Sequence, residues 1–493
     1  MALRLFNTLS GKIGEFQPLI EGEVRMYACG PTVYDYGHIG NFRTFVAVDI
    51  LRRYLRQSGY KVRHVMNITD VDDKIIRNAA QAGVSVQQYT AKYQKAFLED
   101  AAALHIEQPE IVRATDNIAQ MAEFIARLVE KGYAYRTEDG SYYFRISKFP
   151  AYGKLSKKDF AGMEDGARVD VDEYEKDNAR DFALWKAPKP GEASWESVIG
   201  PGRPGWHIEC SVMSMKELGE SFDLHAGGED LIFPHHENEI AQSEALTGKQ
   251  FARFWFHARF LLVEGEKMSK SVGNFFTLRD LVLKGHKPSS IRYLLTSVPY
   301  RNQLNFTFEG LQQAAASVDR LRNFRLRLSG SFAEGSSLAM ASLAEETSKR
   351  LRESLDDDLN TAQAQAAIFD MVRAANAAID SGNLRRGDVA PLLAALDQFD
   401  EIFSVLKDDD AETMRRIFAW AKADGREKDI SPALLEIVRS AALSDDQINQ
   451  KIERMKAARA AKNFAESDRV RTELTAEGVI IEQTKEGVRW RRK

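Results

Sequence analysis

Residues 29–41 are CGPTVYDYGHIGN, a stretch that combines glycine and proline with one cysteine and one histidine. The apolar run at residues 24–28 precedes it and is typical of a buried strand. From about residue 42 to 54, apolar side chains recur at helical spacing and predict a helix. The stretch is therefore a strand-to-helix turn, and in a parallel sheet such a turn lies at the carboxyl end of a strand, where nucleotides bind.

His38 stands at the expected start of this helix. A helix N-terminus offers free N–H groups and a partial positive charge, which suit a phosphate group. An ordinary tight turn with a structural histidine is the alternative, because short glycine motifs also occur without a ligand.

The pattern that follows predicts an α/β protein. A second strand at residues 61–69 completes a βαβ unit, and threonine and aspartate in residues 69–76 open a helix as N-caps. Strands at residues 222–225 and 259–263 and a helix at residues 234–246, with a proline in its first turn, form a second half. We expect a Rossmann-type parallel-sheet catalytic domain with an inserted subdomain, followed by an α-helical bundle and a small C-terminal domain.

A length of 493 residues is too great for one core and predicts about three domains. The helix face in the insertion is formed by Met121, Phe124, Ile125, Leu128 and Val129. The expected divisions are 1–108 for the first half of the catalytic domain, 109–204 for the insertion, 205–275 for the second half, 276–430 for the helix-bundle region, and 431–493 for the C-terminal domain.

The composition is that of a soluble globular protein, with 44% hydrophobic and 28% charged residues. No apolar run approaches the ~18 residues of a membrane span, and the N-terminal residues 1–7 are too short in apolar length for a signal peptide. We therefore expect a cytoplasmic location and no membrane partner. The net charge of −4 does not indicate a nucleic-acid binder, although a local basic face would suffice for one.

The chain has only two cysteines, Cys29 and Cys210. They are an incidental buried pair, a disulfide or metal ligands, and a disulfide is disfavoured in a cytosolic enzyme. His235 and Glu239 are four residues apart and face the same side of a helix. These four side chains are of the types that bind tetrahedral zinc, and their wide separation in the sequence favours a functional site over a structural zinc. The HENE sequence at residues 236–239 is not the metalloprotease motif HExxH.

Residues 267–271, KMSKS, form a basic turn after a strand. Lysines in such a turn are usually solvated, but beside a phosphate site Lys267 and Lys270 would neutralise the charge of a triphosphate.

Two of these motifs resemble the signatures of class I aminoacyl-tRNA synthetases. Residues 37–41, GHIGN, are similar to the first signature, with Asn41 in place of a second histidine, and KMSKS matches the second signature letter for letter. Further stretches resemble the cysteinyl-tRNA synthetase family, which carries asparagine at that position: CGPTVYD at 29–35, NITDVDDK at 67–74, WHIEC at 206–210, FPHHENE at 233–239, DDLNT at 357–361 and the tail from residue 463.

The resemblance covers nearly the whole chain, and it implies an enzyme that activates L-cysteine with ATP and transfers it to the 3′ end of a cysteine-specific tRNA. It implies one Zn²⁺ per chain, to which the substrate's thiolate adds, so that serine is rejected without an editing domain. The implied residues are His38, Lys267 and Lys270 for catalysis; Thr32, His38, Gly40, Asn41, Asp230, Lys267 and Lys270 for ATP with its Mg²⁺; Gly30, Thr32, Thr69 and Trp206 for cysteine; and Cys29, Cys210, His235 and Glu239 for the metal.

The C-terminal tail is the most basic part of the chain. Residues 451–493 contain 12 lysines and arginines against 7 acidic residues, and Trp490 stands among the last basic residues. A solvated face explains most charge runs, but this one would also suit RNA, including the anticodon.

We expect a monomer. Two other functions are alternatives to tRNA charging. One is a ligase that passes cysteine to an aminosugar, although such enzymes lack the C-terminal region. The other is a catalytically silent paralogue that binds RNA.

Overall fold

The structure is a computed structural model, and it describes residues 2–158, 168–169, 181–189, 192–440, 445–484 and 487–492. Contacts divide the chain into two compact units. The first consists of Met1–Leu262, Val298–Leu304 and Glu353–Thr361, and the second of Val263–Ser297, Asn305–Arg352 and Ala362–Lys493.

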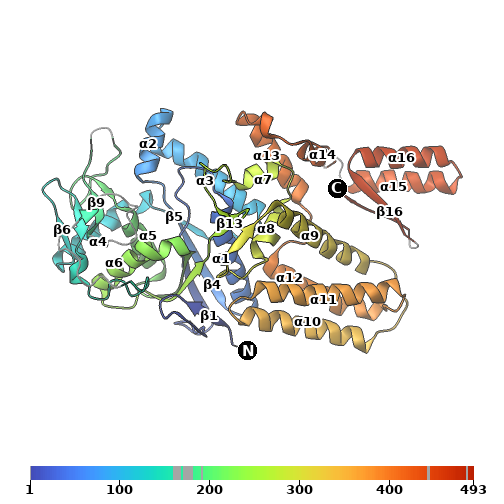
Figure 1. Cartoon of the computed structure of the whole chain (residues 1–493), viewed down its shortest axis with the longest axis horizontal. Helices are drawn as coiled ribbons and strands as arrows, with labels where there is room; N and C mark the ends of the chain where they lie inside the picture. The colour runs from blue at the N-terminus through green and yellow to red at the C-terminus, as the bar shows by residue number, and fades with distance from the viewer. Residues whose placement is uncertain are drawn as a thin grey trace. The chain divides into compact units, whose positions relative to one another are not determined.

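A five-stranded parallel sheet is the centre of the first unit, with the strand order β12-β11-β3-β4-β5 (Figure 1). Its strands are β3 (Glu23–Ala28), β4 (Lys61–Ile68), β5 (Glu110–Arg113), β11 (Phe222–Gly228) and β12 (Ala252–Ala258). From β3 the chain moves to one side of the sheet through β4 and β5, whereas from β11 it moves to the other side through β12. The order therefore reverses between β3 and β11, and such a switch point opens a crevice for ligands at the carboxyl ends of the strands.

Helices cover both faces of this sheet. Helix α1 (Ile39–Gln57) packs on β4, β11 and β12, whereas α5 (Trp206–Leu218) packs on β3 and β4 and against α6 (Glu237–Thr247). Because α1 and α6 connect strands in opposite directions by right-handed crossovers, they cover opposite faces. The expected Rossmann-type arrangement is confirmed.

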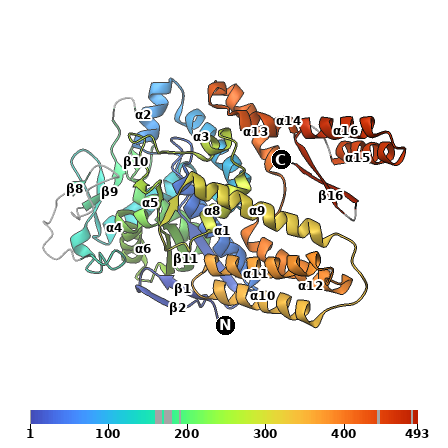
Figure 2. The same cartoon turned by 45° about the vertical axis from the view of Figure 1, so that its right-hand side comes forward.

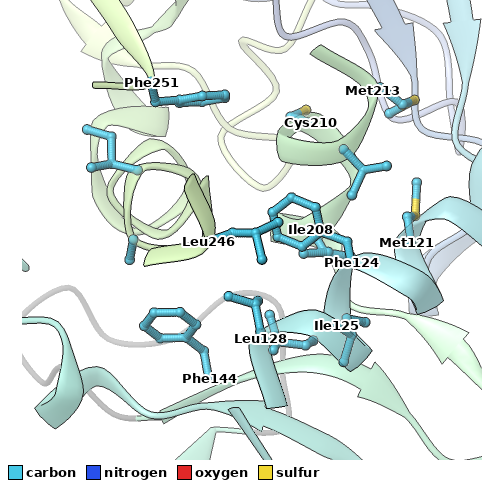
Figure 3. Packing of buried hydrophobic residues seen from close by; sticks show 14 of the residues in the cluster. Met121, Phe124, Ile125, Leu128, Phe144, Ile208, Cys210, Met213, Leu246 and Phe251 are labelled. Atoms are coloured by element: carbon cyan, nitrogen blue, oxygen red, sulfur yellow. The ribbon is translucent and has the colours of Figure 1, made fainter. Parts of the chain in front are cut away.

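The insertion contains a second, mainly antiparallel sheet and helix α4 (Ile118–Glu130). The strands are β6 (Ala134–Arg136), β7 (Tyr142–Phe144), β8 (Arg168–Val169), β9 (Asp181–Lys186) and β10 (Arg203–Pro204). Figure 3 shows Phe124 and Leu128 of α4 among the side chains of Ile208 and Leu246, so the insertion shares one apolar core with the helices that carry the candidate site. The remaining elements of this unit are the hairpin β1 (Arg4–Asn7) and β2 (Lys12–Glu15), with helices α2 (Asp73–Ala82) and α3 (Val86–Ala103).

The second unit is mainly helical, as expected. Helices α10, α11 and α12 run side by side in both views (Figures 1 and 2). Its elements are β14 (Glu266–Lys267), α7 (Leu278–Leu283), α8 (Pro288–Thr296), α9 (Phe308–Leu328), α10 (Leu338–Asp356), α11 (Thr361–Asp380), α12 (Arg386–Phe403), α13 (Asp410–Ala423) and α14 (Pro432–Ser440), with β13 (Leu261–Val263) and β15 (Leu304–Phe306) near its limits.

The C-terminal part has a small core of its own. Helices α15 (Asp445–Ala460) and α16 (Phe464–Ala476) pair with each other, and the hairpin of β16 (Val479–Thr484) and β17 (Gly487–Arg492) packs on α16. Trp490 is half-buried against this core and donates a hydrogen bond to Asn449 at 2.8 Å. Its ring therefore supports the local fold, and the expected contact with RNA stays a prediction.

Several sequence-based expectations differ from the structure. Strand β12 was not expected, and β5 belongs to the parallel sheet although it follows the expected boundary at residue 108. The helix expected from Pro234 begins only at Glu237 as a regular α-helix. Of the predicted cap residues, Asp72 caps α2, whereas Thr69 uses its hydroxyl elsewhere. Val129 is exposed rather than part of the buried face of α4. Residues 159–167, 170–180 and 190–191 of the expected insertion lie outside the described residues.

Gly30 is required by a close approach of two strands. A Cβ atom at this position would lie 1.7 Å from the backbone oxygen of Asn67. We expect Gly30→Ala to lower the free energy of unfolding by about 1–3 kcal/mol or more, because the end of β4 must move. Gly14→Ala is the matched control, since a Cβ there meets nothing within 4 Å. Thermal unfolding of both variants checks this, and equal melting temperatures would contradict the close approach.

Candidate active site and metal centre

The four predicted metal ligands come together although they are up to 210 residues apart in the sequence. Cys29 follows β3 at the switch point, Cys210 is in the first half of α5, His235 precedes α6, and Glu239 is in its first turn. One ligand atom from each lies within 4.8 Å of the others, and all four side chains are buried. The structure thus confirms their proximity, which the spacing of these residues in the sequence could only suggest.

The distances within the cluster are those of ligands around a common point. The two Sγ atoms are 3.7 Å apart, and Cys29 Sγ lies 3.7 Å from Glu239 Oε1. His235 Nε2 is 3.1 Å from the same carboxylate oxygen. Two thiols, one imidazole and one carboxylate fit a divalent metal ion that accepts sulfur ligands.

Sequence reasoning missed four histidines around this cluster. His207 shares a hydrogen bond with His235 between their Nδ1 atoms at 3.0 Å, and His225 Nε2 lies 2.7 Å from Glu239 Oε2. Contacts of this kind orient metal ligands from outside. His236 Nε2 is 3.2 Å from Cys29 Sγ, and His236 Nδ1 contacts His257 Nε2 at 2.8 Å.

A second set of four residues also has the geometry of a metal site. Cys29 and Glu239 are common to both sets, and His225 and His236 replace Cys210 and His235 in the second one. The adjacent pair His235-His236 was the only signal in the sequence that pointed to these additional donors.

Electrostatics stabilise charged forms inside the cluster. Burial by itself raises the pKa of Glu239, but the histidines His225 and His235 lower it to about 2. Burial lowers the pKa of His235, but the charges of Glu239 and Cys210 and the hydrogen bonds with them together outweigh it and raise the pKa to about 10. For Cys210, burial is outweighed by hydrogen bonds from Cys29 and His235, and the pKa falls to about 6. A thiolate and a carboxylate are therefore ready to bind a cation, although burial raises the pKa of the Cys29 thiol.

His38 and Asn41 form a capping box at the start of α1. The backbone N–H of Asn41 donates to His38 Nδ1, and the backbone N–H of His38 donates to Asn41 Oδ1, both at 3.1 Å. Because Nδ1 accepts a hydrogen bond, the neutral ring carries its proton on Nε2. Gly40 lies in the first turn of the same helix. This geometry gives a physical reason for asparagine at position 41.

The residues expected to hold the amino acid lie at the same edge of the sheet. The backbone N–H of Gly30 donates to Asn67 Oδ1 at 2.8 Å, and Thr32 pairs with Thr69 in an isolated bridge. The ring of Trp206 stacks on His235, with 4.2 Å between the ring centroids. Of these residues, Gly30 adjoins the predicted ligand Cys29 and Trp206 contacts the predicted ligand His235, so this part of the predicted pocket borders the cluster.

Asp230 and the two lysines complete the predicted set. Asp230 is exposed just after β11, and its Oδ1 lies 2.4 Å from where a Cβ at Gly228 would stand, so a side chain at Gly228 would displace it. Lys267 and Lys270 belong to the second unit. There Lys270 lies over the ring of Phe275 at 5.0 Å, and the backbone N–H of Ser269 donates to Asn274 Oδ1 at 2.7 Å. The part of Lys267 and Lys270 in the candidate site stays a prediction.

Comparisons with known proteins identify the chain. A family profile of class I (C) tRNA synthetase catalytic domains matches residues 15–316, and a DALR-domain profile matches residues 350–407. The fold is similar to that of methionyl-tRNA synthetase from Mycobacterium tuberculosis in complex with methionyl-adenylate, with a TM-score of 0.56, 18% identity, and coverage of 86% of this chain and 95% of that chain. The chain thus belongs to the class I aminoacyl-tRNA synthetases.

Its relatives within that class are more specific. The cysteine–tRNA ligase of Koribacter versatilis (strain Ellin345) is 68% identical, and that of Solibacter usitatus (strain Ellin6076) is 54% identical, each over the full length of both chains. The chain belongs to the cysteine–tRNA ligase family, which confirms the resemblance found in the sequence. In the part of the chain that the structure describes, none of the helices has the length and apolar character of a membrane span.

Proposed function

We propose that this chain attaches cysteine to its tRNA and that it selects cysteine at a zinc ion bound by Cys29, Cys210, His235 and Glu239. The observation that carries the proposal is the buried cluster of two thiols, an imidazole and a carboxylate at the switch point of the sheet. Full-length similarity to cysteine–tRNA ligases supports it. When bound there, zinc would supply a Lewis acid that prefers a thiolate over a hydroxyl group.

The chain's own residues would serve both steps of the reaction. In the first step the carboxylate of cysteine attacks the α-phosphorus of ATP and pyrophosphate leaves. We assign the Nε2–H of His38 to the phosphates, because the capping box fixes the ring. Lys267 and Lys270 would neutralise the charge of the pyrophosphate together with Mg²⁺, and Asp230 would bind the ribose.

In the second step a ribose hydroxyl at the 3′ end of the tRNA attacks the carbonyl carbon of the cysteinyl-adenylate, and AMP leaves. Thr32, Gly40 and Asn41 would line the nucleotide side of the crevice, whereas Gly30, Thr69 and Trp206 would enclose the amino acid. The same proposal includes the expected domain division and a monomeric state. It also includes a cytoplasmic location, which the tRNA and ATP substrates favour.

Pyrophosphate exchange tests the proposed function. The purified protein should catalyse exchange between ATP and pyrophosphate with cysteine and not with serine, and it should then charge a cysteine-specific tRNA. A protein without exchange would be the silent RNA-binding paralogue, and exchange without tRNA charging would favour transfer to an aminosugar.

The C-terminal part should matter for tRNA and not for the adenylate. Because α15, α16 and their hairpin have a separate core, removal of residues 445–493 should leave the rest of the chain folded. We expect the KM for tRNA to rise about tenfold or more, since phosphate contacts dominate the affinity for nucleic acids. Cysteine-dependent exchange serves as the internal control. Equal damage to both reactions would mean that this part is structural.

A further inference from the structure

Glu209 is a buried carboxylate that the proposed chemistry does not use. It lies on α5 between His207 and Cys210 and is only 1% exposed. Its Oε1 atom is buried and has no hydrogen-bond partner among the residues that the structure describes. A buried carboxylate with an unused oxygen is costly, so it requires an explanation.

The surroundings of Glu209 are negative rather than positive. Burial raises the pKa of the Glu209 carboxyl, and the acidic groups of Cys210, Asp70 and Asp72 raise it further. The second oxygen, Oε2, accepts a hydrogen bond from the hydroxyl of Thr69 at 2.6 Å. Thr69 in turn accepts one from Asn67 Nδ2 at 3.2 Å. The carboxylate is therefore held in one orientation without an opposing cation among these neighbours.

These contacts connect Glu209 to the amino-acid side of the crevice. Thr69 directly follows β4 and pairs with Thr32, and the Asn67 side chain also accepts a hydrogen bond from the backbone N–H of Gly30. The next residue in the chain, Cys210, belongs to the candidate metal cluster. A cysteine whose sulfur is bound at that cluster carries its ammonium group only two carbons away from the sulfur. The substrate thus brings a cation close to the place where one is missing.

We propose that Glu209 is the counter-ion of the α-ammonium group of the cysteine substrate, and that the Thr69 hydroxyl fixes its orientation. This inference rests on the proposed function, since it takes cysteine as the substrate. Glu209 thereby becomes a specificity-determining residue. It distinguishes an amino acid from other small thiols, whereas the metal cluster distinguishes sulfur from oxygen.

Two analogues of cysteine separate the two kinds of recognition. Cysteamine has the thiol and the ammonium group, and 3-mercaptopropionate has the thiol and the carboxylate. Both are measured as competitive inhibitors of cysteine-dependent pyrophosphate exchange in the zinc-loaded protein. In Glu209→Gln we expect the KM for cysteine and the inhibition constant of cysteamine to rise about 10- to 100-fold, the usual effect of losing a charged hydrogen bond. The inhibition constant of 3-mercaptopropionate and the KM for ATP should stay within about twofold.

The matched control is Asp70→Asn. Asp70 is a second buried carboxylate near Thr69, but its two oxygens are already engaged by the N–H and the hydroxyl of Thr115 at 2.9 and 2.6 Å. The control should change the ratio of the two inhibition constants much less than Glu209→Gln does. Glu209→Asp, which keeps the charge, should restore part of the affinity for cysteamine.

The outcomes separate this inference from the proposed function. Equal weakening of both analogues in Glu209→Gln, or a loss of zinc from this variant, would overturn the inference, because Glu209 would then only support the metal cluster. If the wild-type protein showed no cysteine-dependent exchange, the proposed function itself would fail.

Discussion

Cys210→Ser should lose its metal and its cysteine activation together. Cys210 is 1% exposed and supplies the thiolate of the cluster, since its pKa is lowered to about 6. A serine hydroxyl is a poor ligand and stays protonated. We expect cysteine-dependent exchange to fall about a hundredfold or more, because even residues that only orient metal ligands change affinity or activity by about 10- to 100-fold. Metal analysis and exchange on the same preparation provide the measurement.

Ser214→Ala is the control for this prediction. Ser214 is buried on the same helix one turn later, and its hydroxyl donates to the backbone oxygen of Ser211 at 3.3 Å, away from the cluster contacts. This variant should keep one metal ion per chain and near-normal exchange. A Cys210→Ser protein that remains fully active without metal would refute the assignment of the ligands.

Lys270→Ala should slow adenylate formation by about a hundredfold or more, the usual cost of removing a group that stabilises charge in a transition state. In the structure Lys270 lies over the ring of Phe275 in a turn of its own unit. The single-turnover rate of adenylate formation at saturating ATP measures the effect. Because the lysine acts on developing charge, the rate should fall more than the affinity for cysteine does.

Lys284→Ala offers a closely matched comparison. Lys284 also lies over a phenylalanine ring, that of Phe276 at 5.9 Å, but it is outside the 267–271 turn. Its replacement should leave the single-turnover rate unchanged. If Lys270→Ala and Lys284→Ala had the same rate as the wild type, Lys270 would have no part in the chemistry.

The parallel sheet could be predicted from the sequence only where a strand contrasts with its surroundings. Strands β3 and β4 stand between clear turns and were found. Strand β12, ARFWFHA, is bordered by further aromatic and apolar residues, so its limits could not be placed. Strand β5 has four residues, none of them fully buried, and such a short segment carries little hydrophobic signal.

The candidate site could be predicted because its residues are of types that bind metals. The residues that surround it could not be predicted. The four candidate metal ligands could be selected by residue type, and the structure brings them together. His207, His225 and His257 gave no signal, because contacts between distant histidines depend on the packing of α5, β11 and β12. The sequence likewise could not show that one carboxylate oxygen of Glu209 is buried without a hydrogen-bond partner among the described residues. This is visible only in the structure.

We propose that cysteine is recognised because its sulfur would join a metal ion held by Cys29 and Cys210. X-ray absorption spectroscopy at the zinc edge measures this directly, since it counts the sulfur atoms around the metal. We expect one zinc per chain with two sulfur ligands in the free protein, a third sulfur ligand after cysteine is added, and no change after serine is added. A sulfur count that stays at two with cysteine bound would contradict it.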